Sequence, residues 1–200
     1  MGTEEGTKIE RPVHKVYLGK FRISRFEVSN IEFEIFQPNH TRSVSSPCDQ
    51  CPVTMVNWFE ASSYCKNKNG RLPSEAEWEK AARGPAEYRY SFGENPDQSK
   101  SNFGHEFQVG VKAVNSFQPN GFGLYNMSGN VWEWVDDWFS FYAKAKRETR
   151  SEMMVFNEKI LRGGSWYNTA YYVNVGMRFK LNPDIKLNSI GFRCAWDVQQ

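Results

Sequence analysis

The residues best suited to chemistry in this chain of 200 residues are its four cysteines. A thiolate can act as a nucleophile, bind a soft metal ion or form a disulfide. Cys48 and Cys51 form a C-x-x-C motif, "CDQC". Neither a second such pair nor a histidine couple accompanies it, and no βαβ pattern surrounds it, so zinc and redox dithiol chemistry are poorly supported. The pair is therefore a structural pair or disulfide, two inert thiols or part of a metal site.

Other metal and nucleic-acid chemistry finds little support. The three histidines, His14, His40 and His105, are dispersed, which disfavours a histidine metal triad. The formal net charge is +2, and the densest basic run, at residues 144–150, is interrupted by Glu148. A nucleic-acid-binding surface usually needs a larger basic cluster, so we expect no nucleic-acid partner.

The composition predicts a folded, soluble domain. Hydrophobic residues make up 40% and aromatic residues 16% of the chain, unlike disordered sequences. No apolar stretch approaches the roughly 20 residues that span a bilayer, and residues 1–15 are polar, unlike a signal peptide. We therefore expect no direct membrane insertion, and the compartment stays open.

Residues 162–194, "RGGSWYNTAYYVNVGMRFKLNPDIKLNSIGFRC", have an unusual texture. Aromatic, aliphatic and asparagine residues alternate with Gly, Arg, Pro, Asp and Lys, and no helical or strand period runs through them. The segment ends in a strand-like phrase at residues 190–194. It therefore predicts a long irregular loop held between two defined ends.

The elements that must position these residues are short. Residues 13–29 predict a strand or hairpin, with Val16, Leu18, Phe21 and Ile23 facing inward. Residues 29–37 predict a helix capped by Ser29 or Asn30, and residues 56–70 predict a second helix that ends at Gly70.

A third helix is the clearest, in "LPSEAEWEKAARG". Ser74 and Glu77 form a capping box, and Gly84 supplies the stop. Irregular backbone follows to about residue 125, residues 139–158 predict a charged loop-like insertion, and short strands are predicted near 160–166 and 190–196. The fold class is α+β with a high loop content.

Several phrases occur in a particular order: "RLPSEAEWEKAARG", "NGFGLYNMSGNVWEWVDDW", "LRGGSW" and "GFRCA". Together they resemble the formylglycine-generating enzyme (sulfatase-modifying factor) family, whose domain is a variant of the C-type lectin fold. The resemblance covers nearly the whole chain. It implies a single domain over residues 1–200, with short helices, small antiparallel sheets and many loops.

The resemblance does not carry the family's oxidase chemistry, because fold alone does not fix function. In the oxidase, a pair of cysteines shortly after the R-G-G-S phrase binds copper and attacks the substrate. Here Asn168 stands at the first position, and the second falls within residues 170–173. No cysteine lies between Cys65 and Cys194, so we expect no copper and no formylglycine-generating activity.

The family also implies a disulfide and a calcium site. Cys65 would pair with Cys194, although two close buried thiols would fit the sequence equally well. Calcium would be bound by the Asn126 side chain, the Gly129 and Val131 carbonyls and the Glu133 carboxylate, which suit a hard cation. Alternatively, Glu133 only accepts hydrogen bonds. A second site would use Asn102, but its acidic partner is missing.

One branch of the family consists of variable proteins diversified by retroelements, which rewrite asparagine codons between R-G-G-S-W and G-F-R. Such rewriting reaches Tyr, Ser, Thr, Ile, Leu and Phe but never Trp, Lys, Glu, Gln or Met. The intervening residues look like a fixed frame: Gly176, Arg178, Lys180, Pro183, Asp184, Lys186, Ile190 and Gly191. The irregular positions are all reachable: Tyr167, Asn168, Thr169, Tyr171, Tyr172, Phe179, Leu181, Asn182, Ile185, Leu187, Asn188 and Ser189.

The leading hypothesis is a non-enzymatic, receptor-type protein that displays residues 167–189 on a C-type lectin scaffold to a protein or surface ligand. Tyr and Asn suit such a surface, as in antibody loops. A family loop with ordinary drift is the alternative at this segment. For the whole chain, the alternatives are an enzyme or accessory factor with other chemistry and an inactive paralogue that binds an active partner.

Overall fold

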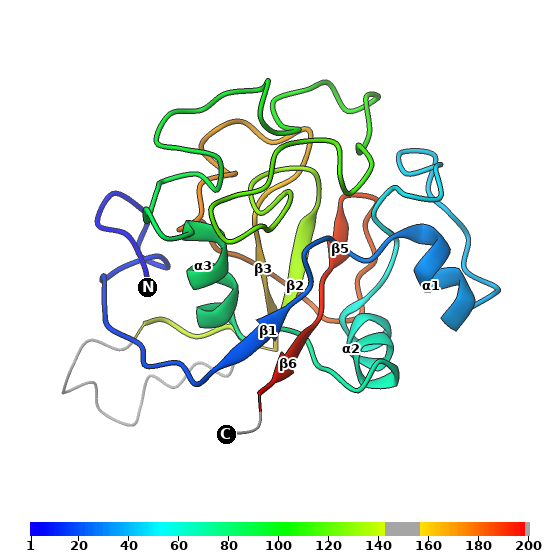
Figure 1. The fold of residues 1–200 in the computed structure, drawn as a ribbon, viewed down its shortest axis with the longest axis horizontal. Coiled ribbons are helices and arrows are strands. Elements are labelled where there is room, and N and C mark those ends of the chain that lie inside the picture. The colour runs from blue at the N-terminus through cyan, green and yellow to red at the C-terminus, as the bar shows by residue number, and fades with distance from the viewer. Residues whose placement is uncertain (143–156, 199–200) are drawn as a thin grey trace.

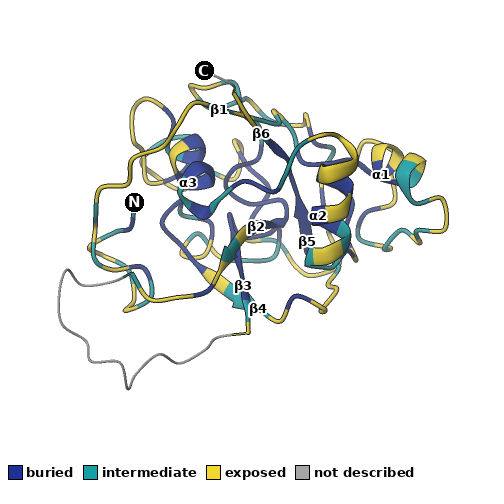
Figure 2. Cartoon of the chain, turned by 90° about the horizontal axis from the view of Figure 1, so that it is seen from below, coloured by how far each residue is buried: buried dark blue, intermediate teal, exposed yellow. Residues whose placement is uncertain are grey.

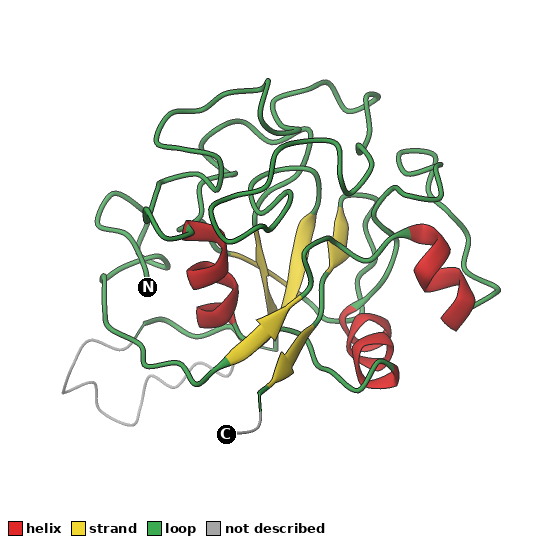
Figure 3. Cartoon of the chain, viewed as in Figure 1, coloured by secondary structure: helices red, strands yellow, loops and turns green. Residues whose placement is uncertain are grey.

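The structure is a computed structural model that describes residues 1–142 and 157–198. Short helices flank two small sheets, and loops make up most of the rest of the chain (Figures 1 and 3). The predicted α+β class is confirmed. In these residues the elements are β1 (Phe21–Ile23), α1 (Asn30–Phe36), α2 (Trp58–Asn67), α3 (Glu75–Arg83), β2 (Trp132–Trp138), β3 (Lys159–Arg162), β4 (Phe179–Leu181), β5 (Ile190–Phe192) and β6 (Ala195–Asp197).

The larger sheet has the strand order β4-β3-β2-β5, and β1 pairs with β6 in a second sheet. The central strand β2 is antiparallel to β3 and parallel to β5. Glu133 on β2 therefore lies between Arg162 on β3 and Gly191 on β5. The two ends of residues 162–194 are thus attached to opposite sides of one strand, and this attachment fixes where the loop begins and returns.

Helices α1 and α3 begin at predicted capping residues, whereas α2, for which no cap was predicted, ends at Asn67 and not at Gly70. In α3 the Glu77 N–H donates to Ser74 Oγ at 3.2 Å, and the Ser74 N–H donates to the Glu77 carboxylate at 2.7 Å, a complete capping box. Gly84 follows with φ of 66°, which favours glycine. Helix α1 begins after Ser29, and α2 begins after Asn57.

Other expectations were wrong. Only Phe21–Ile23 form a strand near the N-terminus, and Val16 and Leu18 are exposed instead of facing inward. The sequence also gave no indication of β2 or of β4, which lies inside the segment expected to be loop. Residues 143–156 of the predicted charged insertion lie outside the described residues.

The core lies on both sides of the larger sheet, whose strands are largely buried (Figure 2). Trp134, Leu161 and Phe192 pack toward Phe33 of α1 and the buried side chains of α2. On the other side, Trp78 of α3 packs with residues of β2 and β3. Both clusters hold the strands from which the segment 162–194 departs.

Candidate functional site

Two arginines of the segment are buried and paired with helix α3. Arg162 donates from Nη2 to Glu79 Oε2 at 2.6 Å and from Nη1 to Glu75 Oε1 at 3.2 Å. Arg178 donates from Nε to Glu75 Oε1 at 2.6 Å and from Nη2 to Glu75 Oε2 at 2.9 Å. Because a buried charge is costly without a partner, these pairs fix the segment against α3.

A third buried arginine closes the segment. Arg193 forms a two-pronged ion pair with Glu133, from Nε to Oε2 and from Nη2 to Oε1, each at 2.7 Å. Glu133 Oε2 also accepts from Trp78 Nε1 at 2.7 Å. The end of the segment is thereby joined to both β2 and α3.

The turn after Arg162 is equally constrained. Gly164 has φ of 73°, and a Cβ there would lie 2.8 Å from the Tyr172 carbonyl oxygen. Trp166 is fully buried. Asn168 Oδ1 accepts from the Ser165 N–H at 3.0 Å and from Ser165 Oγ at 2.7 Å. The Asn168 side chain therefore stabilises the turn, although the sequence placed it among the ligand-binding residues.

Between these anchors, large side chains are exposed. Tyr171 is 45%, Tyr172 41%, Phe179 43%, Ile185 41% and Leu187 40% exposed. Thr169 and Asn182 are exposed as well, whereas Tyr167, Asn168, Leu181 and Asn188 are half-buried. Most of the predicted ligand-binding positions thus have surface available for contact.

Ser189 departs from this pattern. It is 1% exposed, because its backbone carbonyl accepts from the Trp132 N–H and its side chain lies 3.4 Å from Tyr167 Oη. The expectation that Ser189 is displayed was therefore wrong. Tyr167 packs on Trp166 and Phe107 and is half-buried, so only part of its side chain is open to a ligand.

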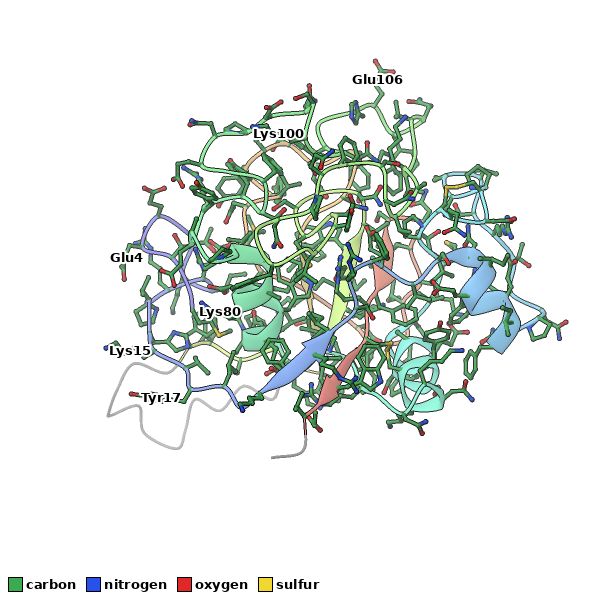
Figure 4. All side chains as sticks on the ribbon, viewed as in Figure 1. Glu4, Lys15, Tyr17, Lys80, Lys100 and Glu106 are labelled. Atoms are coloured by element: carbon green, nitrogen blue, oxygen red, sulfur yellow. A yellow bond between two sulfur atoms is a disulfide. The ribbon has the colours of Figure 1, made fainter. Side chains whose placement is uncertain are left out.

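Two neighbours were missed by sequence reasoning. Phe107 is 56% exposed, and its loop is held to the segment by backbone hydrogen bonds from Gly104 to Asn168 and from His105 to Trp166. Figure 4 shows Glu106, beside Phe107, at the tip of this loop. Met55, also exposed, donates its N–H to the Leu187 carbonyl at 3.0 Å. No local sequence pattern indicates either contact, because Phe107 and Met55 both lie in irregular loops far from the segment in sequence.

The predicted calcium ligands lie around a buried polar cluster. Asn126 Nδ2 donates to Glu27 Oε2 at 2.8 Å, while its Oδ1 is buried without a hydrogen-bond partner. Asn130 Nδ2 donates to Glu27 Oε1 at 2.9 Å. Burial, together with the Glu133 carboxylate and against the opposing effect of Arg193, raises the pKa of Glu27 to about 7. Glu27 was missed by sequence reasoning, because it lies 99 residues from Asn126.

This cluster fits a hard cation in part. The unpartnered Asn126 Oδ1 is an oxygen ligand, and Glu27 adds a carboxylate to Glu133. Among the residues that the structure describes, Glu133 Oε1 accepts from Arg193 alone, which leaves one of its lone pairs for another partner. Within residues 1–142 and 157–198, however, no three His, Cys, Asp or Glu side chains gather as a metal site.

Residues 1–198 match the sulfatase-modifying factor enzyme 1-like domain. The chain belongs to this family. It is 36% identical to the formylglycine-generating enzyme of Streptomyces coelicolor, over 81% of this chain and 58% of that protein. It is 34% identical to the serine/threonine-protein kinase pkn1 of Chlamydia pneumoniae, over 98% of this chain but only 36% of that protein. The chain thus spans about a third of the length of that kinase.

Solved structures share the fold of this sulfatase-modifying factor domain. Treponema denticola variable protein 1 superimposes with a TM-score of 0.84 at 24% identity, covering 98% of this chain and 91% of that chain. The M1 variant of the major tropism determinant gives 0.54 at 16% identity, covering 88% and 50%. The predicted resemblance to the family and to its variable proteins is confirmed at the level of fold.

The family's oxidase positions hold no thiol in this member. Asn168, at the first position, is hydrogen-bonded to Ser165, and residues 170–173, within which the second position falls, contain no cysteine. All four cysteines are paired, in the disulfides Cys48–Cys51 and Cys65–Cys194. No helix in the described part of the chain is long and apolar enough to cross a membrane.

Proposed function

We propose that this sulfatase-modifying factor domain is a non-enzymatic ligand-binding protein that displays the side chains of residues 167–189. The observation that carries the proposal is the contrast inside the segment. Within residues 162–194, Arg162 and Arg178 are buried and ion-paired, whereas Tyr171, Tyr172 and Phe179 are each more than 40% exposed. Exposed apolar patches on such a rigid support commonly mark interaction sites.

The chemistry of the exposed residues favours a protein or surface ligand. Tyrosine offers a large contact area with a polar tip and only two side-chain torsions, so little entropy is lost on binding. Ile185 and Leu187 add exposed apolar side chains elsewhere in residues 167–189. A frame held by buried ion pairs is preorganised, which reduces the ordering cost of association.

A display experiment tests this function directly. One library randomises Tyr171, Tyr172, Phe179, Ile185 and Leu187. A matched library randomises five exposed residues elsewhere, Lys15, Tyr17, Val44, Tyr88 and Phe122. Both are selected against a globular probe protein such as lysozyme. The first library should yield folded binders and the second should not. Equal yields from both libraries, or none from the first, would contradict the proposal.

We also propose that the segment is diversified by a retroelement. Its irregular residues are those reachable from asparagine codons, and the fold is shared with Treponema denticola variable protein 1. Sequencing the locus should reveal a near-copy of the coding sequence for residues 162–194, with asparagine codons at the variable positions, beside a reverse-transcriptase gene. A locus without any such copy would contradict this origin.

Absence of the family's oxidase activity is the matching biochemical expectation. Purified protein incubated with copper and a sulfatase-type cysteine peptide should give no aldehyde by mass spectrometry. The formylglycine-generating enzyme of Streptomyces coelicolor, to which this chain is 36% identical, serves as the positive control. Conversion of the peptide by this chain would overturn the non-enzymatic assignment.

Calcium binding is a separate proposal. Asn126, Gly129, Val131 and Glu133 would supply oxygen ligands, and Glu27 would add a second carboxylate. Burial, and to a smaller extent the Glu133 carboxylate, raises the pKa of Glu27, and a divalent cation would favour the charged form of this carboxylate. When bound, the ion would brace the turn before β2 and thereby the sheet that carries the segment.

A further inference from the structure

A groove lies on the protein surface, and no residue of 167–189 lines it. It is formed by residues 24–28, by α1 and α2, and by β6, which lie near one another in Figure 1. Its volume is about 620 Å³, within the range of roughly 300–1,000 Å³ that is typical of ligand sites. Its lining residues are Ser24, Arg25, Phe26, Glu27, Val28, Glu32, Ile35, Tyr64, Lys68, Cys194 and Trp196.

The groove has an unusually exposed apolar wall. Ile35 is 75% exposed, and Ile31, one helical turn earlier on α1, is 40% exposed. Residues four apart lie on the same face of a helix, so the two side chains form an apolar stripe beside the groove. Phe26 and Trp196 are half-buried on the other lining segments. The apolar part of a ligand could cover these exposed and half-buried side chains.

Cations surround the same groove without carboxylate partners. The Arg25 guanidinium lies 5.6 Å from the Phe26 ring and 5.8 Å from the Tyr125 ring. Lys68 Nζ lies 5.7 Å from the Tyr64 ring. Neither cation forms an ion pair with any described residue. Arg25 Nε donates to the Gly123 carbonyl at 3.4 Å, so its Nη groups and Lys68 Nζ are the donors that a negatively charged ligand would meet.

The two acidic lining residues do not cancel this charge. Glu27 is 1% exposed, and its carboxylate accepts from the interior side chains of Asn126 and Asn130. Glu32 accepts from the Ser29 N–H at 2.9 Å and from Ser29 Oγ at 2.7 Å, which holds its charge at the start of α1. A carboxylate at a helix N-terminus is partly compensated by the helix dipole.

We propose that this groove binds a small organic anion with an apolar body, such as a medium-chain or aromatic carboxylate. Its apolar part covers Ile35, Phe26 and Trp196, and its anionic group is attracted by Arg25 and Lys68. The site is independent of the display function proposed above, because none of the displayed residues lines it.

The test uses anilinonaphthalene sulfonate, a fluorescent aromatic anion, as the probe. The wild-type protein should bind it saturably, decanoate should compete, and the neutral analogue phenylnaphthylamine should bind more weakly. The Arg25→Gln, Lys68→Gln double variant should weaken binding roughly threefold to tenfold, as expected for two exposed charge contacts. Ile35→Ser should weaken it without unfolding the protein, since Ile35 is largely exposed.

Matched controls are Lys15→Gln and Val44→Ser, which remove a charge and an exposed apolar side chain outside the groove; Figure 4 places Lys15 away from α1 and α2. Both should bind the probe as the wild type does. Absence of probe binding, or equal weakening by controls and groove variants, would overturn the proposal. Dimerisation of the wild type that Ile35→Ser abolishes would also overturn it, because a second copy would then cover the groove.

Discussion

Two regions lie interleaved within the 33 residues from Arg162 to Cys194. Arg162, Trp166, Arg178, Phe192 and Arg193 are all buried and form the frame, whereas displayed residues such as Tyr171, Phe179 and Ile185 are exposed. Asp184 and Lys186, which the sequence assigned to the frame, are exposed as well. The frame is joined to α3 and β2 by ion pairs, whereas Phe179 packs its ring against Trp132 of β2 and remains 43% exposed. The backbone of an irregular loop can therefore be held in place without regular hydrogen bonding, because a few of its side chains are buried and anchored.

The largest expected effect comes from emptying the frame. Trp166→Ala and Phe192→Ala each remove a fully buried aromatic ring, and each should lower the free energy of unfolding by about 3–5 kcal/mol. Urea denaturation followed by tryptophan fluorescence or circular dichroism measures the change. A loss below roughly 1 kcal/mol would place these residues with the displayed set and remove the contrast.

Breaking a buried ion pair should have a similar effect. Arg178→Met leaves Glu75 with one fewer partner in the interior, for an expected loss of about 3–5 kcal/mol in urea denaturation. The control is Lys186→Met, which breaks the exposed Lys186–Glu60 pair on the same segment and should cost less than about 1 kcal/mol. Equal losses would show that burial does not distinguish frame from display.

The two disulfides sharpen the comparison further. Cys65 and Cys194 are separated by 129 residues, so Cys65→Ser with Cys194→Ser should cost about 2–5 kcal/mol under oxidising conditions. Cys48 and Cys51 lie three positions apart, and their removal should cost much less, since closing a short loop removes little entropy from the unfolded chain. Thermal melts of both variants measure this order, and a reversed order would contradict it.

Calcium should act on the frame with a defined pH dependence. Saturation at about 100 times the Kd should add about 2.7 kcal/mol of stability, seen as a higher melting temperature. Glu27 must lose its proton to bind a cation, and its pKa is raised to about 7, so the rise in melting temperature should be larger near pH 8 than near pH 6.

Without calcium, the stability contributed by Glu27 should fall as the pH rises from 4.5 through about 7, because the unfolded state releases this proton first.

The control for this prediction is Glu27→Gln, which keeps a polar side chain and removes the charge. It should abolish most of the calcium response and its pH dependence. A melting curve that is identical in calcium and in EGTA at both pH values would leave the cluster purely structural.

Local signals in the sequence predicted local features well. The Ser74–Glu77 capping box gave the start of α3, because both partners lie within one turn. Strand β2 was missed because its first four residues are all buried and show no alternation. Strand β4 has three residues and is defined by pairing with β3, which no local pattern encodes.

The site was predicted in the same uneven way. Codon reachability identified exposed residues such as Tyr171 and Phe179, yet it also included Ser189, because reachability carries no information on burial. Glu27, Phe107 and Met55 reach the functional regions only through contacts distant in sequence. These contacts depend on how distant parts of the chain are brought together in the fold, which no local sequence pattern encodes.

The smallest expected effect provides the most direct test of the central claim. A variant combining Tyr171→Ser, Tyr172→Ser, Phe179→Ser and Ile185→Ser should remain folded, because each exposed site contributes on the order of ±0.5 kcal/mol. Its melting temperature should lie within roughly 8 °C of the wild-type value, given about 2–4 °C per kcal/mol for a protein of this size. A thermal melt followed by circular dichroism decides the matter. Loss of the cooperative transition would show that these side chains form part of the core and would contradict a display surface on a rigid frame.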